Sequence, residues 1–183
     1  MNKWKTLSSK LAFDNPWFRV RQDSIELPSG KIIDDYFMWQ DNDVAQMVPI
    51  TKEGKFILDK QYKHAVGQIM TEFPAGYFNE NEKPEEAARR ELLEETGYTA
   101  EKFTFLGKLN HNPTKEIGNL YIFLVENAYK KEQQHLDETE NIELVELTME
   151  EIIEKIQNHE IWATGTISAF FLALQKLGYK NEK

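Results

Sequence analysis

The feature that most constrains this sequence is an acidic stretch at residues 76–98, which begins at a glycine and passes into a helix-forming segment. Glu91, Glu94 and Glu95 lie three and four residues apart, so in a helix they share one face. Like charges on one face destabilise an isolated helix by about a few tenths of a kcal/mol per pair. Hard divalent cations such as Mg²⁺ bind carboxylate oxygens. We therefore expect this face to bind a cation.

The chain divides into two predicted domains, residues 1–43 and residues 44–183. The N-terminal domain contains alternating segments at residues 17–27 and 31–39, separated by a turn at residues 28–30, which predict antiparallel β-strands. Two or three strands alone are marginally stable in water. We therefore expect this small β subdomain to pack on the main domain or on a second subunit.

The main domain mixes strand and helix patterns, which predicts an α+β fold with a sheet between helices. Apolar and alternating runs predict extended segments at residues 44–50, 55–63, 69–76, 102–109, 120–126 and 142–147. Helical patterns predict helices at residues 84–96, 148–156 and 162–177. Pro84 suits the first turn of the first helix, and Gly97 suits the position after its last turn.

Composition excludes several classes of function. The formal net charge of −9 argues against general affinity for nucleic acids or anionic membranes. The absence of cysteine excludes disulfides, zinc–thiolate sites and thiol catalysis. No apolar run approaches the roughly 20 residues of a membrane span, and the N-terminus has no apolar signal core. We expect a cytoplasmic protein.

The acidic stretch fits the Nudix box, a motif of Gly, five residues, Glu, seven residues, Arg-Glu, an apolar residue, any residue, Glu-Glu, any residue, Gly and an apolar residue. The matching residues are Gly76, Glu82, Arg90, Glu91, Leu92, Glu94, Glu95, Gly97 and Tyr98. Tyr98 differs slightly, since an aliphatic residue is commoner there. The chain thus resembles the Nudix hydrolases, which implies an α/β/α sandwich with a mixed sheet.

The surrounding residues resemble the ADP-ribose and nucleoside-diphosphate-sugar pyrophosphatase branch of that family. Gln61–Lys63 and Glu72–Gly76 resemble the approach to the box in that branch, and Pro113 stands where it often has a proline. Residues 1–43 resemble its N-terminal β subdomain. This branch often has Arg where Lys63 stands, and its ADP-ribose enzymes often have Ser-Pro-Gly around the position of Pro113.

The resemblance implies Mg²⁺- or Mn²⁺-dependent hydrolysis of the pyrophosphate bond of ADP-ribose or a related nucleoside diphosphate sugar. The products would be a nucleoside monophosphate and a sugar phosphate. Two alternatives stay open, namely hydrolysis of nucleoside triphosphates or dinucleoside polyphosphates, and a non-catalytic Nudix-fold sensor of nucleotide sugars. We also expect a homodimer, formed through residues 1–43.

The metal ligands are implied by the same resemblance. Glu91 and Glu95 are the predicted primary Mg²⁺ ligands, Glu94 completes or bridges the site, and the backbone carbonyl of Ala75 adds a further ligand. These are oxygen donors, which Mg²⁺ prefers.

Catalytic support is expected from two places. In the box, Arg90 orients the carboxylates, while Glu82 either binds a more distant ion or has a supporting role. In the branch that this chain resembles, the general base is a glutamate on the loop before the last strand. On that loop, Glu138 is the first candidate and Glu140 the second.

Candidate substrate contacts combine basic residues for the diphosphate with aromatic residues for the base ring. The basic candidates are Lys63, Arg19 and Arg21, and the aromatic candidates are Phe18 and Tyr36. Pro113 completes the set.

Overall fold

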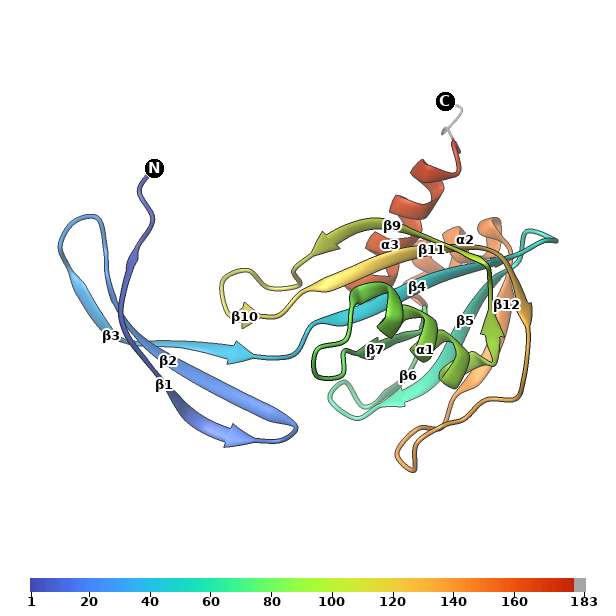
Figure 1. Ribbon diagram of the computed structural model, residues 1–183. Helices are drawn as coiled ribbons and strands as arrows, with labels where there is room; N and C mark the ends of the chain where they lie inside the picture. Colours follow the sequence, from blue (N-terminus) through green and yellow to red (C-terminus); the bar gives the residue numbers. More distant parts are fainter. Residues whose placement is uncertain (180–183) are drawn as a thin grey trace. The chain divides into compact units, whose positions relative to one another are not determined.

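The computed structural model describes residues 1–179 and forms two compact units (Figure 1). The N-terminal unit comprises residues 1–43 and 110–119, and the main unit comprises residues 44–109 and the chain from residue 120 onward. Residues 110–119 belong to the N-terminal unit because their short strand pairs with β3 (Ile32–Gln40) of that unit. The predicted division into residues 1–43 and 44–183 leaves this segment in the main domain.

The structure contains three helices and twelve strands in the described residues. The helices are α1 Pro84–Thr96, α2 Met149–Gln157 and α3 Thr164–Lys176. The strands are β1 Lys5–Asn15, β2 Phe18–Glu26, β3 Ile32–Gln40, β4 Val44–Thr51, β5 Phe56–Lys63, β6 Gln68–Glu72, β7 Ala75–Tyr77, β8 Tyr98–Thr99, β9 Lys102–Leu109, β10 Glu116–Ile117, β11 Leu120–Lys130 and β12 Glu143–Leu147. Within residues 1–179, no helix is long and apolar enough to cross a membrane.

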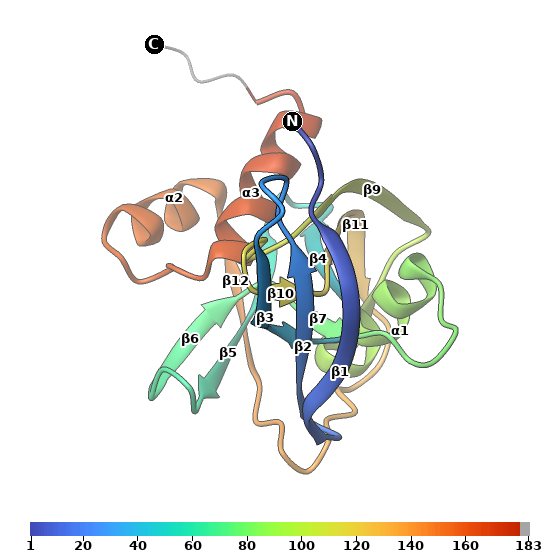
Figure 2. The ribbon, with the colours of Figure 1, turned by 90° about the vertical axis from the view of Figure 1, so that its left-hand side faces the viewer.

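The main unit is built around a mixed sheet whose central order is β12-β5-β4-β11-β8, with β6 paired to β5, β7 to β4 and β9 to β11. Strands β4 and β11 run parallel, while the other pairs of this sheet are antiparallel. Helix α1 lies on one face, and α2 and α3 lie on the other (Figure 2). The predicted α/β/α sandwich is confirmed.

Two apolar layers hold these helices against the sheet. Ala87, Ala88 and Leu92 of α1 are fully buried in a cluster with Ala45 and Met47 of β4. On the opposite face, a larger cluster joins β4, β5 and β11 to α2 and α3, and it includes Val48, Phe56, Leu58, Leu124, Ile152 and Phe170. Alternate residues of β4 therefore pack in the two layers, as the two-residue period of a strand requires.

The N-terminal unit is a four-stranded sheet of order β1-β2-β3-β10. Strands β2 and β3 pair antiparallel, as predicted, while β1 adds an antiparallel strand that the pattern of its residues does not indicate, and β10 adds a short parallel pairing to β3. Ten of the eleven residues of β1 are exposed. Large apolar side chains are exposed across this unit, namely Trp4, Leu7, Leu11, Phe13, Trp17, Phe18, Ile32, Phe37 and Trp39. Within itself, this unit buries little of its apolar surface.

Candidate active site

Helix α1 carries the acidic face, and its ends are fixed by local contacts. At the start, the Lys83 backbone N–H donates to Glu86 Oε2 at 3.1 Å. At the end, Gly97 adopts a φ of 71°, and its N–H donates to the Leu93 carbonyl at 2.8 Å. A positive φ favours glycine because it has no side chain to clash with the backbone. The helix therefore ends just after the glutamates.

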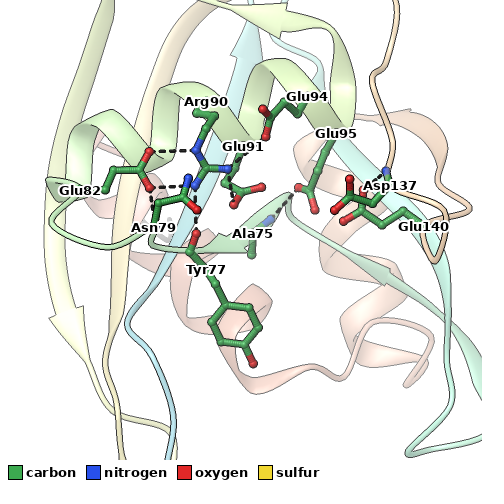
Figure 3. Close-up of polar contacts among 10 residues, drawn as sticks. All are labelled: Ala75, Tyr77, Asn79, Glu82, Arg90, Glu91, Glu94, Glu95, Asp137 and Glu140. Atoms are coloured by element: carbon green, nitrogen blue, oxygen red, sulfur yellow. Dashed lines mark hydrogen bonds and ion pairs between the residues drawn. The ribbon is translucent and has the colours of Figure 1, made fainter. Parts of the chain in front are cut away.

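Arg90 links the loop before α1 to the glutamates of the helix (Figure 3). Its Nε and Nη2 each donate to a carboxylate oxygen of Glu82 at 2.8 Å. Its Nη1 donates to Glu91 at 2.7 Å and to Glu94 at 3.0 Å, while Nη2 also reaches the Tyr77 carbonyl at 3.0 Å. The hydrogen bonds from Arg90 hold the pKa of Glu82 below its usual value. Arg90 therefore contacts three carboxylates at once, and its role in orienting metal ligands stays a prediction.

Glu95 is almost fully buried beside strand β7. Its side chain accepts a hydrogen bond from the Ala75 N–H at 3.0 Å, and the residue is 7% exposed. Burial, together with the negative charges of Asp59 and Glu91, raises the pKa of Glu95 to about 9. A carboxylate in this position is costly when ionised, unless a cation compensates for its charge.

Glu91 lies between Arg90 and Gly76. Burial raises the pKa of Glu91, and the hydrogen bond from Arg90 opposes that rise. A Cβ added to Gly76 would overlap the Glu91 carboxyl group. Strand β7 therefore approaches the helix so closely at Gly76 that any side chain there would displace the Glu91 carboxyl group from its contact with Arg90.

The chemistry of these donors fits a divalent cation. Glu91 and Glu95 are oxygen donors, and their pKa values are raised by burial, so both gain from a nearby positive charge. In residues 1–179, however, no three His, Asp or Glu side chains are gathered in a geometry that would hold a metal ion. One reason is that the Glu91 carboxylate is turned toward Arg90.

Of the two candidate bases, the structure brings Glu140 to the site. Glu140 accepts a hydrogen bond from the Asp137 N–H at 3.0 Å, and its charge contributes to the raised pKa values of Glu91 and Glu95. Figure 3 shows it across from Glu95. Glu138 is exposed and has no such effect on either glutamate.

Lys63 is the one candidate substrate contact in the main unit. Its Nζ donates to Gln61 Oε1 at 2.6 Å and lies 3.4 Å from Glu72 Oε2. Its positive charge opposes the rise in the pKa of Glu95, so it lies near the acidic site.

The other candidate contacts lie in the N-terminal unit, where each has partners of its own. Arg19 lies 3.4 Å from Asp14, and Arg21 lies 2.9 Å from Asp23. The Tyr36 O–H donates to the Thr114 carbonyl at 2.8 Å. In addition, Phe18 packs on Trp39 with ring centroids 5.7 Å apart, and Pro113 lies in the segment 110–119. Their roles in substrate binding stay predictions.

Sequence reasoning missed a buried acid, Asp59 of β5. It is 4% exposed, and burial together with Glu72 raises its pKa to about 7, against the influence of Lys63. An Asp after the apolar run Phe-Ile-Leu, at the centre of a predicted strand, is the signal that could have identified it.

A second feature missed from sequence is a buried polar contact behind the site. Thr166 of α3 accepts a hydrogen bond from the Phe73 N–H at 3.2 Å and lies 3.4 Å from Gln46 Nε2. Phe73 precedes Pro74 and Ala75, and the Ala75 N–H binds Glu95. Helix α3 therefore helps to fix the backbone that positions Glu95.

We expect Thr166→Val to weaken the fold by about 1–3 kcal/mol, since it leaves the buried Phe73 N–H without its acceptor. Metal-dependent activity should also fall, because the backbone leading to Ala75 loses an anchor. Urea unfolding and activity as a function of Mg²⁺ concentration measure the two effects. Thr164→Val, on an exposed position of the same helix, is the matched control. Equal stability of the two variants would contradict this role.

The fold and the site together define a class of protein, an α/β/α sandwich with a partly buried acidic face on the helix that follows a glycine loop. Comparison with known proteins identifies the family. Residues 41–169 match the model of the NUDIX domain, and residues 4–38 match that of the nucleoside diphosphate sugar hydrolase N-terminal domain. The chain belongs to the Nudix family. Nudix hydrolases generally need a divalent metal ion.

Individual relatives support this assignment over nearly the whole chain. An ADP-ribose pyrophosphatase of Bacillus subtilis (strain 168) is 32% identical over 166 residues, covering 90% of this chain and 89% of the relative. A methanol dehydrogenase activator of Bacillus methanolicus is 30% identical over 174 residues, covering 94% of each chain. A crystal structure of an ADP compounds hydrolase superposes with a TM-score of 0.85 at 24% identity, over 97% of this chain and 96% of that one, and it supports the fold.

Proposed function

We propose that this protein hydrolyses the pyrophosphate bond of ADP-ribose or a related nucleoside diphosphate sugar, with Mg²⁺ as the preferred ion. The observation that carries the proposal is the pair formed by partly buried Glu91 and buried Glu95 beside strand β7, with Arg90 holding the carboxylates of Glu82 and Glu91. The names of the relatives support the substrate class, since they include an ADP-ribose pyrophosphatase and an ADP-sugar pyrophosphatase.

Hydrolysis of a phosphoanhydride needs neutralised phosphate oxygens, an activated water and a positioned substrate. A bound divalent ion supplies positive charge to the phosphate and to the water. Glu91 and Glu95, with Glu94 and the Ala75 carbonyl, would hold that ion, while Glu82 would support the site through Arg90.

The remaining steps fall to residues outside the helix. Glu140 would accept the proton of the attacking water, because its carboxylate faces the site. Lys63 would pair with a diphosphate oxygen, exchanging its present contact with Glu72 for the substrate. Water adds to one phosphorus of the diphosphate. The bond from that phosphorus to the bridging oxygen breaks, and its electrons leave with the bridging oxygen, which stays on the other phosphate.

A substrate panel tests the proposal. It contains ADP-ribose, GDP-mannose, UDP-glucose, dinucleoside polyphosphates and nucleoside triphosphates, each with Mg²⁺ or Mn²⁺, and phosphate is measured after coupling to a phosphatase. Fastest turnover of a nucleoside diphosphate sugar is expected. Preference for triphosphates or dinucleoside polyphosphates would support the first alternative. Binding of a nucleotide sugar without any turnover would instead indicate a sensor.

We expect Glu140→Gln to lower kcat by about 100-fold, the lower end of what a general base contributes. Glu138→Gln should retain most activity, because that side chain is exposed. Both variants remove one negative charge from the same loop, so any difference in kcat between them reflects where the side chain lies and not the loss of charge. Steady-state kinetics at saturating Mg²⁺ measure the effect. A larger loss in Glu138→Gln would assign the base to Glu138.

We also propose a homodimer formed through residues 1–43, in the cytoplasm. The exposed apolar side chains of this region, among them Trp4, Phe13 and Trp39, are more than a small free sheet normally leaves to water. Light scattering coupled to size-exclusion chromatography should give twice the mass of one chain. A monomer at every concentration tested would contradict the dimer.

A further inference from the structure

Asp59 is a buried acid outside the Nudix box. Phe56 and Leu58 of strand β5 face the cluster of α2 and α3, so Asp59 points to the opposite face, the side of α1. The residue is 4% exposed, and its Oδ1 is buried without a hydrogen-bond partner. An acid with this degree of burial normally has its oxygens paired or bound to a metal.

Two other acids lie near Asp59, one on strand β6 and one on helix α1. In the pairing of β5 with β6, Asp59 lies opposite Glu72. Among the charged groups near Glu95 of α1, Asp59 contributes most to the rise in the pKa of Glu95. The two carboxylates therefore come from different elements on the same side of the sheet, and each is more than nine-tenths buried.

The cations nearby are engaged elsewhere. Lys63 acts on both acids, but its Nζ contacts Gln61 and Glu72. Arg90 donates to three other glutamates and to a backbone carbonyl. The buried charge of Asp59 and Glu95 thus has no ion-pair partner within 4.0 Å in residues 1–179.

We propose that Asp59 is part of the divalent-cation site, where its carboxylate acts on the ion from strand β5 together with Glu95 of α1. This inference rests on the proposed function, which assigns the ion to Glu91 and Glu95, and extends the site beyond residues 76–98. A divalent ion would offset both buried charges and give Asp59 Oδ1 a partner. If Asp59 had only a structural role, its replacement by Asn would leave ion binding unchanged.

The test is Asp59→Asn, which keeps the shape of the side chain and removes its charge. Mn²⁺ is titrated into the full chain without nucleotide, and free Mn²⁺ is measured by electron paramagnetic resonance. We expect the Kd for Mn²⁺ to rise by about tenfold or more, the range found when groups supporting a metal site are replaced. In EDTA, the variant should unfold at a temperature no lower than the wild type, and Mn²⁺ should raise that temperature less.

Two further variants make the result decisive. Glu146→Gln removes one charge from an exposed position of the main unit and should bind Mn²⁺ as the wild type does. Glu95→Gln should lose Mn²⁺ binding. Wild-type affinity in Asp59→Asn together with loss in Glu95→Gln overturns the role of Asp59 and leaves the proposed metal site standing. Wild-type affinity in both overturns the metal site itself. If Asp59→Asn does not fold, Asp59→Ser replaces it, with the same expected loss.

Discussion

Glu95→Gln should lower metal-dependent hydrolysis by about 1000-fold or more, because the cation it would help to hold supplies several kcal/mol of charge stabilisation in the transition state. The substitution keeps the size of the side chain and its ability to accept the hydrogen bond from the Ala75 N–H. It removes the negative charge that attracts the ion. Turnover as a function of Mg²⁺ concentration measures the loss.

The same variant should be at least as stable as the wild type in EDTA. Ionised Glu95 is buried among other acids, which is why its pKa is raised to about 9, and the neutral amide avoids that cost. A loss of activity with unchanged or higher stability therefore separates a role in metal binding from misfolding. Glu101→Gln, an exposed acid after the same helix, is the control and should keep wild-type turnover. Substantial activity in Glu95→Gln would contradict the metal assignment.

The acidic helix could be predicted closely because its signals are local. Pro84 begins α1 and Gly97 follows its last residue, as the sequence indicates. The spacing of Glu91, Glu94 and Glu95 also places them correctly on one face, since helical geometry depends only on neighbours within a turn. The same holds for α2, whose first turn is fixed by Thr148 and a partner three residues later.

Features that depend on distant residues could not be predicted in this way. Strand β1 carries Ser, Thr and Lys with no clear alternation, and pairing with β2 rather than its own pattern makes it a strand. Strand β10 is two residues long and pairs with β3, more than 70 residues earlier in the chain. No local sequence pattern indicates which distant strand so short a segment pairs with, so the segment 110–119 could not be assigned to the N-terminal unit.

In the candidate site, too, features with local signals could be predicted and features that depend on distant residues could not. The carboxylates of α1 follow from spacing, whereas the choice between Glu138 and Glu140 depends on how a polar loop folds toward the helix. Within that loop, the hydrogen bond from Asp137 to Glu140 holds this side chain near the site. The place of Asp59 on the α1 side of the sheet follows from how β5 pairs and packs in three dimensions, which no local pattern indicates.

Gly76→Ala should reduce activity by about 100-fold, the cost of displacing a catalytic group by about 1 Å. The added methyl group would overlap the Glu91 carboxyl group, and strand β7 cannot retreat freely because Gly76 pairs with Ala45 in the sheet. Crowding of this kind also lowers stability by about 1–3 kcal/mol.

Gly107→Ala is the matched control for this substitution, since a Cβ at residue 107 meets no atom within 4 Å and its φ is not in the left-handed region. It should leave both kcat/KM and the urea midpoint close to wild type. Comparing the two variants separates close approach at Gly76 from a general effect of replacing a strand glycine. If Gly76→Ala retains full activity, Glu91 has room to move without loss, and its orientation by Gly76 and Arg90 is not required for hydrolysis.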